Sequence, residues 1–271
     1  SVLEPAELYR SKGAVNTELV NDQTYTFTDR GDREVTLRPE MTPTAARLIA
    51  GRQKELAFPV RWFSIPNLFR YERPQKGRLR EHWQLNCDIF GSTHIAADIE
   101  IIQLAYQTLI NFGARPEDFV ITINDRALMD RIYTALGLNP DQISDITTLN
   151  DKKNKISDEE YQSELDKITA DETISEEVKL VISNTDEETD VIIGLNQLGI
   201  KNIIFDKSIA RGFDYYTGTI FEIFATDEAG KPTGRALLGG GRYDNLTELF
   251  STESVPGVGF GMGDVALLEF L

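Results

Sequence analysis

The sequence is poor in the residues that build disulfides and metal sites. Cys87 is the single cysteine among 271 residues, which excludes an intramolecular disulfide and a thiolate-rich zinc site, and indicates a reducing compartment such as the cytoplasm. The two histidines, His82 and His94, lack the spacing of a helical metal pair, so we assign no metal ligands. There is no run of 18 apolar residues, so we expect no membrane contact.

Positive charge is also scarce, and negative charge is concentrated. The chain has 28 basic and 44 acidic residues, a net charge of −16, and residues 141–190 alone contribute −11. This acidic block is rich in helix formers and is typical of a solvated helical insertion. The opposite feature is RYERPQKGRLR at 70–80, with four arginines. The overall charge argues against non-specific nucleic-acid binding, but it leaves room for a local polyanion site.

The order of apolar and turn residues predicts an α+β protein with an antiparallel sheet. We expect a hairpin at 26–37, with Gly31 at positive φ in its turn, and then a helix over 42–55 with Thr42 as N-cap and Pro43 as first residue. A helix near 242–250 should follow the glycines of LGGGRYD. The remaining predicted elements are strands at 59–71, 81–91, 118–124, 202–206 and 217–225, a helix at 97–113 ended by Gly113, helices up to about 198, and a strand running into a helix over 257–271.

The strand at 81–91 has two chemically different faces. Trp83, Leu85, Cys87 and Ile89 share the apolar face, which predicts a buried and inert thiol. The other face carries Gln84, Asn86 and Asp88. A carboxylate and amides on one face can bind a small polar ligand, but they are equally typical of the wet face of a sheet.

Four other segments are candidates, and each has a structural alternative. The arginines of RYERPQKGRLR can bind phosphate bidentately or form a solvated turn. Glu40, in LRPEMT, can hold an ammonium group or cap a helix. Arg211 in ARGFDYYTGTIFE can be a surface ion-pair partner, with Tyr215 and Tyr216 in the core. The glycines of LGGGRYD allow close backbone approach, but match neither a dinucleotide-binding nor a P-loop motif.

Together these segments resemble one family. TFTDRGDREVTLRPEMTPTAAR, FRYERPQKGRLREHWQLNCDIFG, ARGFDYYTGTIFE, LGGGRYDNL and PGVGFGMG are similar, in order and spacing, to the catalytic domain of histidyl-tRNA synthetases, which are class II aminoacyl-tRNA synthetases. FRYERPQKGR resembles motif 2 of the class, and ARGFDYYTG resembles the histidine-specific signature. The resemblance implies an antiparallel catalytic sheet flanked by helices, and a homodimer.

The resemblance also implies roles for individual residues. Arg70, Glu72, Arg78 and Arg211 would bind ATP, with Arg70 and Arg211 as the catalytic cations at the α-phosphate. Glu40, Thr42 and Gln84 would hold the amino-acid end of histidine, and Asp88 and Tyr216 would read its imidazole. The remaining members of the implied histidine site are Tyr215, the glycines Gly239, Gly240 and Gly241 as its floor, and Tyr243 as its wall.

The implied reaction is the activation of histidine by ATP with Mg²⁺, followed by transfer to the 3′ end of tRNA(His). The implied catalytic core comprises residues 1–125 and 200–271, the helical insertion comprises 126–199, and the anticodon-binding domain would lie outside this sequence. One departure is Ala266, which stands where the motif 3 arginine is expected. It favours the alternative of a non-catalytic paralogue, a histidine-sensing regulatory subunit of ATP phosphoribosyltransferase. The intact Arg70 and ARGFDYYTG favour the enzyme.

Overall fold

The structure is a computed structural model that describes residues 2–10, 23–72, 79–153, 156–183, 188–209 and 215–271. Its strands are β1 (Leu3–Pro5), β2 (Tyr25–Thr28), β3 (Glu34–Leu37), β4 (Val60–Ser64), β5 (Asn67–Phe69), β6 (Glu81–Phe90), β7 (Phe119–Asp125), β8 (Ile203–Phe205), β9 (Thr219–Thr226), β10 (Pro232–Arg242) and β11 (Gly257–Gly263). Its α-helices are α1 (Glu7–Arg10), α3 (Thr42–Arg52), α4 (Ile95–Asn111), α5 (Arg126–Ala135), α6 (Pro140–Lys152), α7 (Asp158–Thr169), α8 (Glu172–Ser183), α9 (Asp190–Gln197) and α10 (Asp264–Phe270). Two 3₁₀ turns are η1 (Pro116–Asp118) and η3 (Leu246–Leu249).

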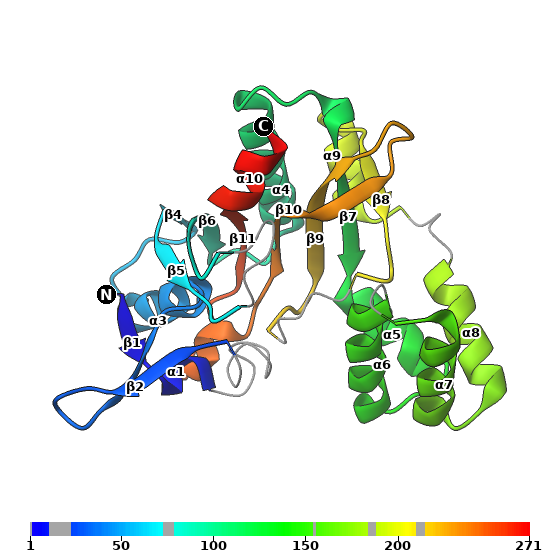
Figure 1. Cartoon of the computed structure of the whole chain (residues 1–271), viewed down its shortest axis with the longest axis horizontal. Coiled ribbons are helices and arrows are strands. Elements are labelled where there is room, and N and C mark those ends of the chain that lie inside the picture. The colour runs from blue at the N-terminus through cyan, green and yellow to red at the C-terminus, as the bar shows by residue number, and fades with distance from the viewer. Residues whose placement is uncertain (1, 11–22, 73–78, 154–155, 184–187, 210–214) are drawn as a thin grey trace.

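The main sheet runs through the middle of the molecule in the order β4-β6-β11-β10-β9-β7-β8, with β5 also paired to β6 (Figure 1). All its strand pairs are antiparallel except β7 with β8. The predicted α+β class with an antiparallel sheet is therefore confirmed. Within the described residues, no helix is long and apolar enough to cross a membrane.

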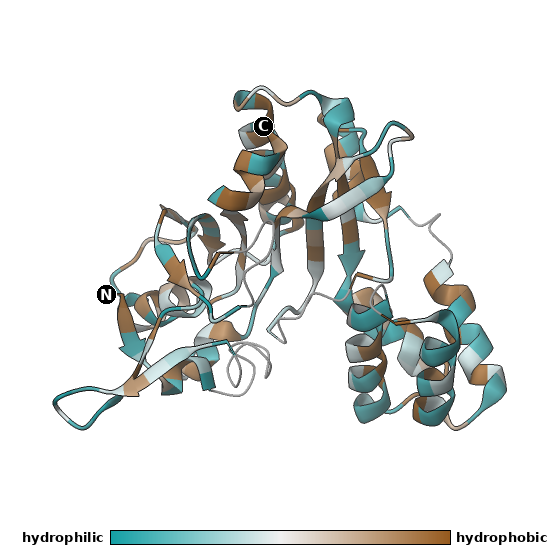
Figure 2. Ribbon diagram, viewed as in Figure 1, coloured by the Kyte–Doolittle hydropathy of each residue, from teal (hydrophilic) through white to brown (hydrophobic). Residues whose placement is uncertain are grey.

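Helices cover the two faces of this sheet differently. α4, α9 and α10 lie over one face, where the strands and α4 contribute most of the apolar core (Figures 1 and 2). Gly113, at φ 101°, follows the end of α4, as predicted. α3 and η3 pack over the other face, together with Tyr215, Tyr216 and Tyr243. The second face thus carries aromatic hydroxyl groups within its core.

The acidic insertion forms a helical unit with a core of its own. α5 to α8 show alternating apolar and polar bands in Figure 2, the pattern of amphipathic helices. They enclose Met129, Tyr133, Ile146, Leu165 and Val178, among others. α9 packs differently, because its residues Val191, Ile192 and Leu195 join the core of the main sheet. The boundaries of the insertion at 126 and 199 stay a prediction.

The hairpin β2–β3 is confirmed, but its turn differs from the prediction. Asp32, at φ 55°, takes the left-handed conformation expected of Gly31. The reason lies in Asp29, whose Oδ1 accepts hydrogen bonds from the backbone N–H of Gly31 (2.8 Å) and of Arg33 (3.0 Å). This side-chain bonding fixes the turn around Asp29, as is common for aspartate in tight turns.

Two other local predictions were wrong. α3 begins at Thr42 itself, with Met41 at the N-cap position and no side-chain cap, so Pro43 is its second residue. LGGGRYD does not open a helix over 242–250: Gly239 to Gly241 pair with β9 and β11 on both sides, and Arg242 pairs with β11. Only the short turn η3 follows. The glycines that were predicted to open a helix instead lie in β10, an inner strand of the sheet.

Candidate active site

The polar face of β6 lies over glycines of the neighbouring strand. Gln84, Asn86 and Asp88 stand opposite Gly263, Gly261 and Gly259 of β11. A Cβ atom at Gly259 would lie 2.4 Å from Asp88 Oδ1 and 2.8 Å from the Tyr243 hydroxyl. A Cβ at Gly261 would lie 1.9 Å from Gln84 Nε2. The missing side chains of β11 therefore give the polar groups of β6 room to lie across the sheet.

Asp88 is buried and accepts a short hydrogen bond from the hydroxyl of Tyr243. The pKa of Asp88 is raised to about 7: burial is the main cause, the hydrogen bond from Tyr243 opposes it, and the charge of Glu40 adds to it. Burial and the neighbouring Asp88 carboxylate also raise the pKa of Tyr243 well above its usual value. Tyr243 is therefore a neutral donor that holds the Asp88 carboxylate in place.

Glu40 forms a second buried carboxylate near Asp88. It lies between β3 and α3, and its Oε1 accepts a 2.5 Å hydrogen bond from the hydroxyl of Tyr215. The Tyr9 hydroxyl donates to the Glu40 carbonyl at 3.1 Å, which ties this residue to α1. The ring centroid of Tyr215 lies 4.8 Å from that of Tyr216 and 5.7 Å from that of Tyr243. The three tyrosines thus form one packed group between the two carboxylates.

Two amide oxygens of this face are buried without a partner among the described residues. They are Gln84 Oε1 and Asn86 Oδ1. Buried polar atoms in proteins are nearly always hydrogen-bonded, so such orphaned acceptors indicate a missing ligand. With the carboxylates of Glu40 and Asp88, they make a surface that accepts hydrogen bonds and favours positive charge. The ligand that fits is small, rich in N–H donors and cationic.

Arg70 and His82 lie near the other end of the same strand. Arg70 follows β5, and its Nε donates to the carbonyl of Pro39 at 2.9 Å, next to Glu40. His82 shares the face of Gln84, since it is two residues away on β6. Burial, and then the charge of Arg70, lower the pKa of His82 to about 4, with Asp264 opposing. Sequence reasoning missed His82, although its even-numbered position on the strand was a visible signal.

Among the predicted site residues, the structure brings Glu40, Asp88, Tyr215, Tyr216 and Tyr243 together in one group. Arg78 and Arg211 lie outside the described residues. Glu72 follows Arg70, and its carbonyl accepts from Arg80 Nε at 3.2 Å. Thr42 is buried at the start of α3, two residues from Glu40. The register places Gly240 opposite Phe260, whereas Gly239 and Gly241 stand in the rows of Asn86 and Asp88.

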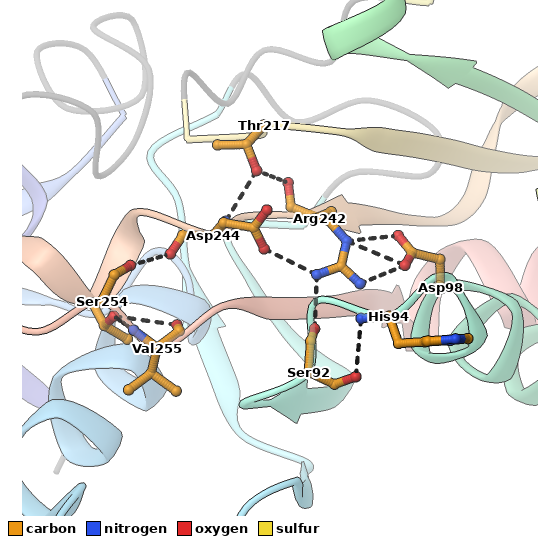
Figure 3. A network of polar contacts seen from close by, with 9 residues as sticks. Ser92, His94, Asp98, Thr217, Arg242, Asp244, Ser254 and Val255 are labelled. Carbon is orange, nitrogen blue, oxygen red and sulfur yellow. Dashed lines mark hydrogen bonds and ion pairs between the residues drawn. The ribbon is translucent and has the colours of Figure 1, made fainter.

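A buried ion pair between Arg242 and Asp98 lies next to Tyr243 (Figure 3). Arg242, the residue before Tyr243, donates through Nε to Asp98 Oδ1 (3.0 Å) and through Nη1 to the Ser92 carbonyl (2.9 Å) and to Asp244 (2.9 Å). Its own carbonyl accepts from the backbone N–H of Thr217 at 2.8 Å. The pair thus connects α4 to the segments that carry Tyr216 and Tyr243. Asp98 and Arg242 were not predicted as part of the site.

Comparison with known proteins agrees with this geometry. A family model described as "Histidyl-tRNA synthetase" matches residues 3–266. The chain is 46% identical over its whole length to a protein of Leptospira biflexa named histidine–tRNA ligase, covering 65% of that protein. It is 41% identical over 98% of its length to the protein of that name from Thermoplasma volcanium, covering 64% of it. The chain therefore spans about two thirds of the length of these relatives.

Solved structures give the same fold. The crystal structure of histidyl-tRNA synthetase from Nostoc sp. PCC 7120 matches 99% of this chain and 65% of its own, with a TM-score of 0.81 at 23% identity. A protein of Bacillus halodurans, described as an "ATP phosphoribosyltransferase regulatory subunit/histidyl-tRNA synthetase", matches 100% of this chain and 73% of its own, also with a TM-score of 0.81 at 23% identity. The architecture is that of a class II aminoacyl-tRNA synthetase catalytic domain. Within that class, the chain belongs to the histidyl-tRNA synthetase family.

Proposed function

We propose that this chain is the catalytic part of an enzyme that activates histidine with ATP and transfers it to the 3′ end of tRNA(His). The observation that carries the proposal is the buried, acceptor-rich face around Asp88 and Glu40, with its orphaned amide oxygens. Histidine matches that face because it has an α-ammonium group and a ring with two nitrogens, at least one of them a donor.

In this proposal, two groups of residues hold the two ends of the amino acid. Asp88, fixed by Tyr243, accepts a hydrogen bond from the imidazole, and Tyr216 reads the ring beside it. Glu40, Thr42 and Gln84 hold the ammonium and carboxylate end, while Tyr215 and Tyr243 shape the site. A site that bonds the ring nitrogens discriminates strongly against apolar amino acids, because its buried polar groups would then be left unpaired.

The ATP end is assigned to Arg70, Glu72, Arg78 and Arg211. Activation is the in-line attack of the histidine carboxylate on the α-phosphorus, with pyrophosphate as the leaving group. Such a step depends on positioning and on neutralising negative charge more than on a general base. Arg70 lies at the His82 end of β6, beside Glu40, so it is well placed to meet the phosphate next to a bound amino-acid carboxylate. Mg²⁺, arriving with ATP, would neutralise the remaining phosphate charge.

Because Ala266 in α10 replaces the usual motif 3 arginine, another cation must hold the distal phosphates, and Arg78 is our candidate for that task. We further propose that the enzyme is a cytoplasmic homodimer, as the family resemblance implies. The alternative, a histidine-sensing regulatory subunit, is suggested by the description of one structural neighbour. It is less favoured, because a sensor needs the Asp88 end of the site but not Arg70 and Arg211.

The test is amino-acid-dependent ATP–pyrophosphate exchange, measured with each of the twenty amino acids in turn, on this chain and on the full-length protein. Exchange with histidine alone supports the enzyme. Histidine binding by calorimetry without exchange in the full-length protein would move the assignment to the sensor. The variant Arg70→Ala separates the two steps, since it should abolish exchange and retain histidine binding. Exchange that survives this change would contradict the assigned role of Arg70.

A further inference from the structure

Tyr9 is a buried tyrosine beside the proposed site, and the family-based assignment leaves it without a role. It lies on α1, 31 positions before Glu40 in the sequence, and its side chain is 1% exposed. Burial raises the pKa of its hydroxyl well above the usual value; the hydrogen bond with Thr44 opposes the shift, and the charges of Glu4 and Glu40 add to it. The Tyr9 hydroxyl therefore keeps its proton at neutral pH and can donate it.

The partners of this hydroxyl fix the direction in which its single proton points. The Glu40 carbonyl, 3.1 Å away, can only accept, so Tyr9 donates to it. The Thr44 hydroxyl lies 3.2 Å from the Tyr9 oxygen and then donates to Tyr9. A Glu4 carboxylate oxygen also lies near Thr44, but at 3.5 Å, the outer limit of a hydrogen bond, and Glu4 has a closer partner in Arg47 at 3.1 Å. The result is a chain of hydrogen bonds from Thr44 through Tyr9 to the Glu40 backbone.

Glu40 lies in the connection between β3 and α3, where the backbone is neither helix nor strand. Contacts from other segments therefore hold this connection in place. The Pro39 carbonyl accepts from Arg70, and the Glu40 carbonyl accepts from Tyr9. The Glu40 carboxylate accepts from Tyr215. Two tyrosines thus hold Glu40 at its two ends, Tyr215 at the side chain and Tyr9 at the backbone.

The position of Glu40 matters because a carboxylate binds an ammonium group strongly only at hydrogen-bond distance. Binding groups have to be held within about 0.5 Å of the productive geometry by neighbours that are themselves fixed. Tyr9 meets this requirement, since it is buried and its hydroxyl is bonded to partners on two different segments.

We propose that Tyr9 is a positioning residue, whose hydroxyl holds the Glu40 backbone so that the Glu40 carboxylate meets the α-ammonium group of histidine. This role rests on the proposed function, in which Glu40 holds that end of the amino acid. Tyr9 acts through Glu40 and touches no substrate. Loss of its hydroxyl should therefore weaken ligands that carry the ammonium group and spare ligands that lack it.

The experiment compares Tyr9→Phe with Tyr133→Phe in the full-length protein, by pyrophosphate exchange. Tyr133 is the matched control, since it is also 1% exposed and its hydroxyl accepts a 3.4 Å hydrogen bond from Asn150 within the helical insertion. We expect Tyr9→Phe to raise the KM for histidine about fivefold or more, and to leave the KM for ATP within about twofold. Tyr133→Phe should change neither KM by more than about twofold. Thr44→Val, which removes the donor to Tyr9, replaces Tyr9→Phe if the latter does not fold.

Histidine analogues separate positioning of Glu40 from general damage to the site. Histidinol keeps the ammonium group and imidazolepropionate lacks it, and both are measured as inhibitors of exchange. Tyr9→Phe should raise the inhibition constant of histidinol by about as much as the KM for histidine, and should leave that of imidazolepropionate within about twofold. Damage to the whole site would weaken the two inhibitors alike.

Three results would overturn the role of Tyr9 while the proposed function stands. They are an unchanged KM for histidine in Tyr9→Phe, an equal loss for the two inhibitors, and an equal rise of the histidine KM in Tyr133→Phe. Absence of histidine-dependent exchange in the unmodified protein would overturn the proposed function, and the role of Tyr9 with it.

Discussion

Two buried aspartates, ten residues apart in the sequence, have opposite surroundings. Asp98 is fully buried on α4, and both of its oxygens accept hydrogen bonds from the Arg242 guanidinium. Asp88 is buried on β6, and among the described residues it accepts a bond from the neutral hydroxyl of Tyr243 and feels the like charge of Glu40. The first carboxylate is compensated by the protein itself, whereas the second is left for a ligand to compensate.

This difference separates a structural charge from a functional one. A buried, compensated pair fixes the geometry of what surrounds it, here the segments of Thr217 and Asp244, which adjoin Tyr216 and Tyr243 in the sequence (Figure 3). An under-compensated carboxylate lowers the stability of the free protein and becomes favourable when a cationic N–H donor binds. Burial of a carboxylate alone therefore does not indicate a binding site. A buried carboxylate that has no cationic partner in the protein does.

The largest expected effect is that of breaking the compensated pair. Arg242→Ala leaves Asp98 charged, buried and unpaired, and should lower the free energy of unfolding by about 3–5 kcal/mol. Urea unfolding at pH 7.5 measures this loss. The matched control is Arg115→Ala, which removes an exposed pair with Asp118 and should cost less than about 1 kcal/mol. A loss from Arg242→Ala no larger than that of the control would contradict the role given to the pair.

Asp88→Asn should affect stability in the opposite direction. The folded-state pKa of Asp88 is about 7 and the ordinary value is 3.8, so the folded protein binds more protons between these values. Its stability therefore falls as pH rises through this window, by a total on the order of 4 kcal/mol above pH 7. Asparagine keeps the acceptor for Tyr243 and removes the charge. The variant should melt at a higher temperature than the unmodified protein at pH 8, and this gain should shrink at pH 5.

The same variant should lose function. Without the carboxylate, histidine-dependent exchange should fall by about 100-fold or more, because the charge that compensates the bound substrate is gone. Gain of stability with loss of activity is the expected signature. If Asp88→Asn were less stable than the unmodified protein at pH 8, the raised pKa would be contradicted. If the variant retained exchange, the role of Asp88 in binding the substrate would be contradicted.

The sequence predicted the polar face of β6 because alternation on a strand is a local property. Gln84 and Asp88 share a face whatever the rest of the fold does. The hairpin and α4 could be predicted for the same reason, because turn residues and the spacing of apolar residues are also local. The Arg242–Asp98 pair joins positions 144 residues apart, and no local pattern shows that these two charges meet. The strand at Gly239 to Gly241 was missed for the same reason, since it is defined by pairing with the distant strands β9 and β11.

The smallest effect is expected at Cys87, the neighbour of Asp88 on the opposite face. Burial, and then the Asp88 charge, raise the pKa of the Cys87 thiol to about 12, so at pH 8 roughly one thiol in 10,000 is ionised. Alkylation by iodoacetamide should therefore be at least about 100-fold slower in the folded protein than in urea, and histidine with ATP should give no further protection. Cys87→Ala should cost about 1 kcal/mol of stability. Fast alkylation that histidine blocks would place the Cys87 thiol in the binding site. It would then be wrong that one face of β6 serves packing and the other serves ligand binding.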